Sequence, residues 1–476
     1  MSTSRVEGSD PRAPRSLWLR EAMGQGFVAE PPLRGETKAD VCIVGGGYTG
    51  LWTALRLKEV EPTLKVVVLE ADVCGGGASG RNGGFILSWW AKFLSLVKQC
   101  GVEEALRLAD ASADAVAEIG AFCSANGLEA AFHQRGWVWA ASNPSQVGAW
   151  TPTMRELDRL GVHPFEELDQ KEAAACTGSA VHGSGVFERT AAVVQPALLA
   201  FGLRRIALAR GMRIHEGSPM TNLRPGAGRV RVETPAGAVT AGRAVLALNA
   251  WAVRFAEIRR RILVVGSDVA VTPSIGRALA DMGWSDGPSV SDSRLLVHYY
   301  RTTDDGRVVF GKGGGILGAG SRVGPRFEGA SPRLAELESA LRTTYPALAG
   351  VPIVQTWTGP IDRSRSGLPL FGSLAHHGSV FYGVGFSGNG VGPSLLAGRI
   401  LASLALGRDD EWARCGLVST PGKRFPPEPV RYVGGRTVRG AIARKERMED
   451  RGRRAGPVTR GLAALAPAGL VPNKGG

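Results

Sequence analysis

The sequence has few cysteines, and they are scattered. Its six cysteines form no Cys-x-x-Cys pair and no Cys/His spacing of the kind that binds zinc, so we expect neither a disulfide framework nor a metal site. No stretch reaches the roughly 18 uncharged apolar residues of a membrane span, and the N-terminal residues lack the apolar core of a signal peptide. A reducing compartment fits this pattern best, and we predict a cytoplasmic protein without a membrane span.

Acidic residues are scarce near the C-terminus. Residues 421–476 contain thirteen Lys and Arg against four acids, and they carry +9 of the net charge of +14. The rest of the chain therefore has only a modest charge, and the basic character belongs mainly to this Pro/Gly/Arg-rich tail. We interpret the tail as a solvated extension or a clamp on the protein's own acidic surface. A tail that binds a polyanion or a membrane is the alternative.

Glycine, by contrast, is abundant. The chain has 66 glycines in 476 residues, about twice the usual share of ~7%, without a collagen-like period. The excess predicts tight turns and places where the backbone closely approaches another group.

One βαβ unit is clear near the start of the chain. Residues 40–44 form a short apolar run that ends at Gly45, residues 49–60 have helical spacing, and residues 66–69 form a second run that ends at Glu70. Strand, glycine turn, helix and strand within about 30 residues predict a parallel sheet with helices on its faces.

Further along, the pattern changes between two kinds of sheet. Parallel-style strands recur at 213–215 and 380–384, whereas 264–272, 294–301 and 307–311 alternate and are joined by turn residues, which favours an antiparallel sheet. We predict an α/β fold with a discontinuous nucleotide-binding domain and an interleaved substrate domain. Its parts are an N-terminal arm (1–38) outside the core, the nucleotide-binding domain (39–88, 185–255 and 350–410), the substrate domain (89–184 and 256–349) and the basic tail (411–476).

The motif Gly45-x-Gly47-x-x-Gly50 lies where a dinucleotide fingerprint belongs, directly after a strand and at the start of a helix. Its glycines allow the tight turn, the approach of backbone N–H groups to a pyrophosphate, and close packing of helix on strand. Glu70 would accept hydrogen bonds from a ribose and would repel a 2′-phosphate, which disfavours NADP. A plain glycine turn and an NAD-dependent dehydrogenase are the alternatives.

Two more glycine-rich loops favour a larger cofactor. Residues 75–84 and 386–393 are distant in the sequence, and the second loop precedes a predicted helix at 394–405. The positive end of that helix would suit the negative charge that develops on a reduced flavin.

The sequence resembles the FAD-dependent family of D-amino-acid, glycine and sarcosine oxidases, and within it the γ-glutamylputrescine oxidoreductase branch. The stretches ADVCIVGGGYTGLWTALRL, VLEADVCGGGASGRNGGF and FYGVGFSGNGVGPSLLAGRILA are among those that carry the resemblance. It implies a Rossmann-type FAD-binding domain, a mostly antiparallel substrate-domain sheet, and oxidation of a C–N bond by hydride transfer to flavin N5, followed by hydrolysis of the imine. The electron acceptor would be oxygen or an unknown carrier.

The resemblance also implies which residues hold FAD. They are Gly45, Gly47, Tyr48, Thr49, Gly50, Glu70 and Ala71 for the ADP portion, Ser79, Gly80, Arg81, Asn82, Gly83 and Gly84 for the pyrophosphate and flavin, and Gly388, Asn389 and Gly390 for the isoalloxazine edge. No Cys or His stands where some relatives attach the flavin covalently, so we expect non-covalent FAD. After Trp357-Thr358-Gly359, the family's usual Asp-Gly-x-Pro is replaced by Ser366-Gly367-Leu368-Pro369.

Candidates for the substrate side are aromatic and basic. On the strand 298–301, alternation places His298 and Tyr300 on one face and Tyr299 and Arg301 on the other, so only one pair can face a cavity. We predict Tyr300 and Trp357 as catalytic residues, with Lys312 as a cation near the flavin; plain core packing and projection of Lys312 into water are the alternatives. We expect a small amine as the partner and no nucleic acid. A non-catalytic or RNA-directed flavoprotein is the competing function.

Overall fold

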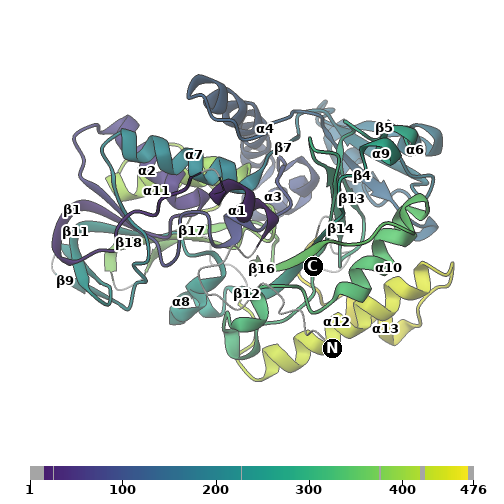
Figure 1. Cartoon of the computed structure of the whole chain (residues 1–476). Coiled ribbons are helices and arrows are strands. Elements are labelled where there is room, and N and C mark those ends of the chain that lie inside the picture. The colour runs from purple at the N-terminus through teal and green to yellow at the C-terminus, as the bar shows by residue number, and fades with distance from the viewer. Residues whose placement is uncertain (1–15, 25, 227, 375–376, 419–423, 470–476) are drawn as a thin grey trace, which may run out of the picture.

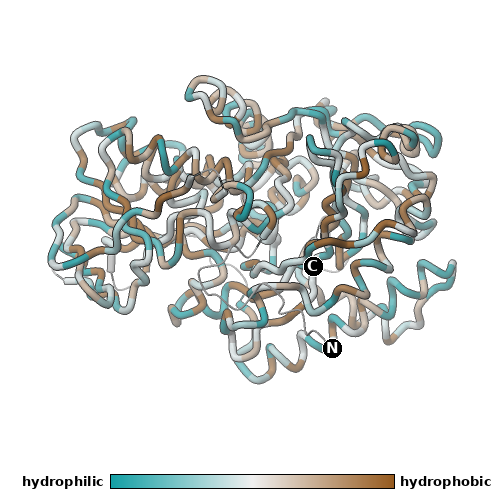
Figure 2. The backbone as a smooth tube through the Cα atoms, viewed as in Figure 1, coloured by the Kyte–Doolittle hydropathy of each residue, from teal (hydrophilic) through white to brown (hydrophobic). Residues whose placement is uncertain are grey.

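The structure is a computed structural model that describes residues 16–469 except 25, 227, 375–376 and 419–423. Two large sheets lie side by side, helices cover the first sheet, and the last two helices run along the second (Figure 1). Hydrophobic residues concentrate on the inner strands of both sheets, and the outer loops are mostly hydrophilic (Figure 2). No helix in the described part of the chain combines the length and apolar character needed to cross a membrane.

Eight strands form the first sheet: β1 (Gly35–Val44), β2 (Val66–Leu69), β8 (Arg213–His215), β9 (Asn222–Gly226), β10 (Arg229–Glu233), β11 (Gly237–Leu246), β17 (Leu370–Leu374) and β18 (His377–Val384). Their order is β17-β18-β11-β1-β2-β8, and β10 and β9 extend it from β11. The central pairs β1–β11, β1–β2 and β11–β18 are parallel. The apolar run of β2 is buried at every position, as expected for a parallel sheet covered on both faces.

The second sheet also has eight strands: β4 (Trp137–Ala141), β5 (Glu166–Leu168), β6 (Ser184–Glu188), β12 (Ile262–Val271), β13 (Ser289–Asp292), β14 (His298–Thr302), β15 (Val308–Lys312) and β16 (Gln355–Ser364). Their order is β16-β12-β15-β14-β13-β4-β6-β5, and the pairs are antiparallel except for β13–β4. The predicted α/β fold with a largely antiparallel second sheet is confirmed. A short pair, β3 (Phe85–Ile86) with β7 (Ala192–Val193), lies apart from both sheets.

The helices are α1 (Leu17–Met23), α2 (Tyr48–Val60), α3 (Phe93–Cys100), α4 (Val102–Ala125), α5 (Thr151–Arg159), α6 (Gln170–Thr177), α7 (Pro196–Ala209), α8 (Ala256–Arg259), α9 (Gly276–Asp281), α10 (Leu334–Thr344), α11 (Pro393–Leu406), α12 (Val430–Glu449) and α13 (Pro457–Ala463). Helices α2 and α11 pack against each other on the first sheet. Gly398 permits this contact, since a Cβ there would lie 2.8 Å from the backbone of Trp52.

Two strands belong to a different sheet than the predicted domain boundaries suggest. Strand β16 falls inside a segment predicted to be nucleotide-binding, and all of β6 except Ser184 does too, yet both strands pair in the second sheet. Strand β16 pairs with β12 along ten residues, from Gln355 to Ser364. This long antiparallel pairing, which local periodicity does not reveal, draws the strand into the second sheet.

The expectation that residues 1–38 form an arm outside the core needs correction for their described part. Ser16 accepts a hydrogen bond from the amide of Leu19 and caps α1, whose residues Leu17 and Trp18 are only 2% exposed. The Trp18 ring meets that of Trp357 edge-to-face, with centroids 6.1 Å apart. The helix is short, so its burial depends on tertiary contacts that sequence periodicity does not indicate.

We predict that Trp18→Ala lowers the free energy of unfolding by about 3–5 kcal/mol, because it empties a buried site and removes an indole hydrogen bond to the carbonyl of Asn82. Urea titration followed by circular dichroism measures the change. Trp18→Phe, which keeps most of the buried ring, should lose about half as much or less. An unchanged midpoint for Trp18→Ala would show that α1 does not contribute to the core.

Candidate functional site

A cavity of about 1010 Å³ lies between the two sheets. Its walls include the β1–α2 turn, the two later glycine loops, and parts of β14 and β16. This volume is at the upper end of the ~300–1,000 Å³ typical of small-molecule sites. The cavity is therefore large enough for an extended cofactor.

The β1–α2 turn forms one end of the cavity. Gly45 has a φ of 113°, and a Cβ there would lie 2.4 Å from the carbonyl oxygen of Ala247. A Cβ at Gly50 would lie 1.9 Å from the carbonyl oxygen of Gly45, so only glycine lets α2 begin this close to the strand end. The turn thus presents the N-terminus of α2, with its positive partial charge, to the cavity.

Glu70 follows β2 and lies beside this turn. Its carboxylate accepts hydrogen bonds from the amides of Gly46 at 2.7 Å and Asp72 at 3.0 Å. Burial raises the pKa of Glu70 to about 7, an effect that the two backbone hydrogen bonds oppose. A carboxylate held in this way is placed to accept hydrogen bonds from ribose hydroxyls.

The loop at residues 76–84 crosses the cavity next to α2. The Ser79 hydroxyl accepts the Tyr48 amide at 2.9 Å, and the Asn82 side chain bridges the carbonyl of Ser79 and the amide of Gly84 at 2.7 Å each. Arg81 donates to the carbonyls of Gly76 and Phe327. The loop is thereby fixed to α2 and to the connection between β15 and β16.

The loop at residues 386–391 forms the opposite wall. Asn389 donates its amide to the carbonyl of Ser88 at 3.1 Å, whereas its buried Oδ1 has no hydrogen-bond partner. A buried, unpaired oxygen that borders a cavity indicates a donor on a ligand. With the helix N-terminus and Glu70 at the other end, this set of groups fits the predicted FAD.

The structure brings most of the predicted cofactor residues together around one cavity. The residues that line it are Gly45, Gly47, Tyr48, Thr49, Glu70, Ala71, Ser79, Arg81, Asn82, Gly83, Gly388, Asn389 and Gly390. Gly50, Gly80 and Gly84 lie behind this wall, where a Cβ would meet a backbone oxygen within 2.6 Å. Their part is to let the backbone pack closely.

The three predicted catalytic residues lie elsewhere. Tyr300 is fully buried in the core of the second sheet, where its hydroxyl bonds His182, and Trp357 is fully buried with its indole N–H on the carbonyl of Arg81 at 2.8 Å. Lys312 bonds the imidazole of His298 at 2.6 Å. None of the three lines the cavity, and Trp357 is linked to it through the hydrogen bond to the 76–84 loop.

The other face of β14 reaches the cavity. Tyr299 lines it and shares a hydrogen bond of 2.8 Å between its hydroxyl and that of Ser267. Its ring lies between Gly83 and Gly311, where added Cβ atoms would come within 2.9 and 2.0 Å of ring carbons. Because these contacts join Tyr299 to residues far apart from it or across the sheet, no local sequence signal identified it.

Several basic side chains on the cavity wall were not predicted, among them Lys92 and Arg363. Lys92 is 6% exposed, donates to the carbonyl of Gly367 at 2.5 Å, and has its pKa lowered to about 7 by burial and by nearby Arg363. Arg363 donates to the carbonyl of Ala468 at 2.7 Å, and burial lowers its pKa to about 10. Among the described residues, no group of three or more His, Cys, Asp or Glu could hold a metal.

Comparison with known proteins agrees with this geometry. Residues 40–404 match the sequence profile of the FAD dependent oxidoreductase family, DAO. The chain is 31% identical to γ-glutamylputrescine oxidoreductase of Escherichia coli K12 over 403 residues, covering 84% of this chain and 89% of that protein. It is 30% identical to the probable oxidoreductase OrdL of Haemophilus influenzae over 387 residues, covering 80% and 86%.

The fold is similar to that of glycine oxidase from Geobacillus kaustophilus, with a TM-score of 0.64, 19% identity, and coverage of 79% of this chain and 96% of that one. The resemblance drawn from the sequence motifs is confirmed. The predictions of an oxidoreductase and of FAD as its cofactor are confirmed with it.

We predict that Glu70→Gln raises the Kd for FAD about 10-fold, because a hydrogen bond to a charged acceptor is worth about 1.5–3 kcal/mol, against about 0.5–1.5 kcal/mol for a neutral one. Affinity of the unsubstituted protein should fall as the pH drops through about 7, where Glu70 becomes protonated, and should stay flat in the variant. Titration of apoprotein with FAD at several pH values measures both effects. Glu61→Gln, at an exposed position, is the control. Equal affinities for FAD in all three proteins would show that Glu70 does not contribute to FAD binding.

Proposed function

The chain belongs to the family of FAD-dependent oxidoreductases, and we propose that it oxidises a C–N bond of a small amine or amino acid. The single observation that carries this proposal is one cavity that joins the glycine loops of the first sheet to Tyr299, Lys92 and Arg363. The names of its relatives, which include γ-glutamylputrescine oxidoreductase and glycine oxidase, support the substrate class.

We propose that FAD is bound without a covalent link. Glu70 and the turn from Gly45 to Gly50 would hold the ADP portion, Ser79 and Asn82 the pyrophosphate and flavin, and the loop at Gly388–Gly390 the isoalloxazine edge. Hydrogen bonds within these loops support the assignment, since they fix donors and acceptors before the ligand arrives.

Bound FAD would supply a two-electron oxidant that takes up a hydride from the C–H bond next to the substrate nitrogen; loss of the N–H proton would give an imine, which water would hydrolyse to a carbonyl compound and an amine or ammonia. The chain's own part is positioning and exclusion of water. Tyr299 and Phe85, whose rings meet edge-to-face with centroids 5.7 Å apart, form an apolar wall. Arg363 stays cationic at neutral pH and would bind an anionic substituent, while Lys92 can accept a proton near pH 7.

We further propose oxygen or an electron carrier as the electron acceptor, a cytoplasmic location, and no nucleic-acid partner. Two arginines of the tail support the last point, because they bond to backbone carbonyls of the protein itself. Arg439 donates to the carbonyl of Gly314 at 2.7 Å, and Arg431 donates to the carbonyl of Arg259.

Anaerobic mixing with a panel of amines, polyamines and amino acids should bleach the visible flavin band with at least one of them, because the cavity would bring the substrate C–H bond to the cofactor. Absorbance spectroscopy measures the loss, and readmission of air tests whether oxygen restores the band. A parallel mixture with matched alcohols is the control. A band that persists with every amine would overturn the proposed function.

Lys92 should impose a pH dependence on the reaction. Its pKa of about 7 makes it neutral at higher pH, so it no longer repels a cationic amine, and kcat/KM should rise as the pH increases through about 7. Lys92→Met should remove this rise, so that the remaining pH dependence of kcat/KM comes from ionisation of the substrate. Steady-state kinetics between about pH 6 and 8 measure it, with exposed Lys98→Met as the control. A rise that persists in Lys92→Met would exclude Lys92 as its source.

A further inference from the structure

The C-terminal segment at residues 424–469 lies outside the part of the chain that matches the family, which ends at residue 404. It is nonetheless folded, and its helices α12 and α13 run along the second sheet (Figure 1). Ile442 of α12 and Ala463 of α13 pack with Leu296 of the β13–β14 connection in one small apolar cluster. The segment therefore has a fixed place against the body.

A buried carboxylate forms the first polar contact. Glu446 of α12 is 7% exposed, and its Oε1 accepts the amides of Leu295 at 2.9 Å and Leu296 at 3.1 Å. Burial raises the pKa of this group to about 7, so the hydrogen bonds compensate only part of the cost of burying it. Because the carboxylate is costly to bury, the two amides of the β13–β14 connection fix where α12 can dock.

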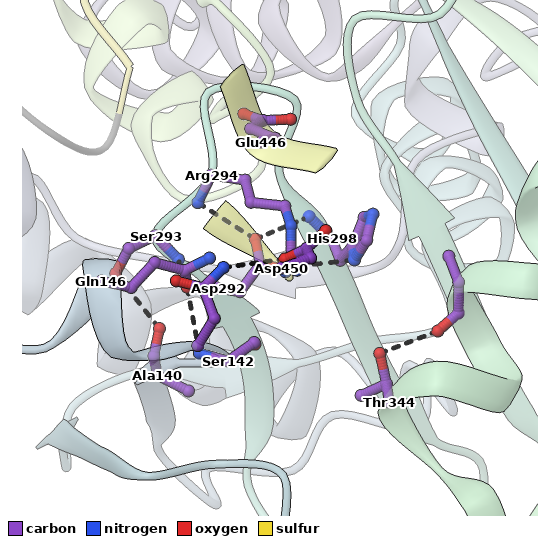
Figure 3. Close-up of polar contacts among 12 residues, drawn as sticks. Ala140, Ser142, Gln146, Asp292, Ser293, Arg294, His298, Thr344, Glu446 and Asp450 are labelled. Atoms are coloured by element: carbon purple, nitrogen blue, oxygen red, sulfur yellow. Dashed lines mark hydrogen bonds and ion pairs between the residues drawn. The ribbon is translucent and has the colours of Figure 1, made fainter. Parts of the chain in front are cut away.

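An ion-pair chain forms the second contact. Arg294 of the same connection lies between Asp292 of β13 and Asp450, the residue that follows α12, and bonds both carboxylates. Asn143 donates to the same Asp450 oxygen at 2.8 Å. Figure 3 shows Glu446 and Asp450 near Arg294, with a dashed line from Arg294 to Asp450.

Further contacts follow along the segment. Arg439 of α12 donates to the carbonyl of Gly314 at 2.7 Å, after β15. Near the end of the described chain, the carbonyl of Ala468 accepts from Arg363 at 2.7 Å, and its amide donates to the carbonyl of Arg365 at 3.0 Å. These bonds hold the segment against the end of β16 as well.

The residues that the segment contacts also line the cavity. Arg294, Leu295, Gly314 and Arg363 belong to its wall, and the segment adds Ala468 and Gly469 to the same wall. A structural element that both fixes several wall residues and supplies wall atoms sets the shape of the space that a ligand can occupy.

We propose that the C-terminal segment from α12 to Gly469 is a built-in cap that sets the upper size limit of the substrate. The docked segment limits the length of the cavity on the substrate side, so amines with long or branched substituents would clash with Leu295 and Ala468. The proposal rests on the proposed function only for the class of substrate; the contacts themselves do not depend on it.

The test compares Glu446→Ala with Glu449→Ala, whose carboxylate pairs with Lys445 on the same helix. The ratio of kcat/KM for a long amine to that for a short one should rise about 10-fold in Glu446→Ala, and Glu446→Gln, which keeps an acceptor oxygen, should restore much of the original ratio. Glu449→Ala should leave the ratio unchanged. Hydrogen exchange at 293–297 should increase in Glu446→Ala alone, and an unchanged ratio despite that increase would overturn the cap.

A second measurement keeps the test independent of substrate. Acrylamide should quench the fluorescence of bound flavin more strongly in Glu446→Ala and in Asp450→Ala than in the unsubstituted protein, because the loosened wall admits the quencher. Equal quenching in all three folded proteins would also overturn the cap. If no amine reduces the flavin but quenching rises in these variants, the proposed function fails while the cap stands.

Discussion

The site depends on how closely the backbone packs at the start of α2. A side chain at Gly45 or Gly50 would collide with a carbonyl oxygen, so these positions fix both the turn and the distance between helix and strand. Through this contact the N-terminus of α2, Glu70 and Ser79 come to lie at one end of the cavity. The 76–84 and 386–391 loops and Tyr299 form the rest of the cavity wall.

Residues that do not touch the cavity hold its two halves together. The loop at 76–84 belongs to the first sheet's side, yet Trp357 of β16 and Trp18 of α1 both donate their indole N–H groups to its carbonyls. Arg81 extends the link to Phe327. These contacts join segments far apart in the sequence, and they explain why buried tryptophans far from the chemistry matter to the geometry of the site.

Much of the cofactor end could be predicted from the sequence, because its signals are local: a strand, a glycine turn, a helix and an acid follow each other within a short stretch. The substrate end could not. Alternation along β14 separates Tyr299 from Tyr300 but does not say which face meets the cavity, and the answer depends on glycines at 83 and 311. Lys92 and Arg363 reach the wall only through tertiary packing. The basic composition of the tail did not indicate that a buried carboxylate and an ion-pair chain hold it against the second sheet.

We propose that three separate stretches of the chain bind one molecule of FAD. Hydrogen exchange of the apoprotein with and without added FAD tests this most directly. We expect protection to appear together at residues 45–50, 76–84 and 386–391, with the same dependence on FAD concentration. Protection confined to residues 45–50 would contradict the account, because the cavity would then hold only a nucleotide at its first end.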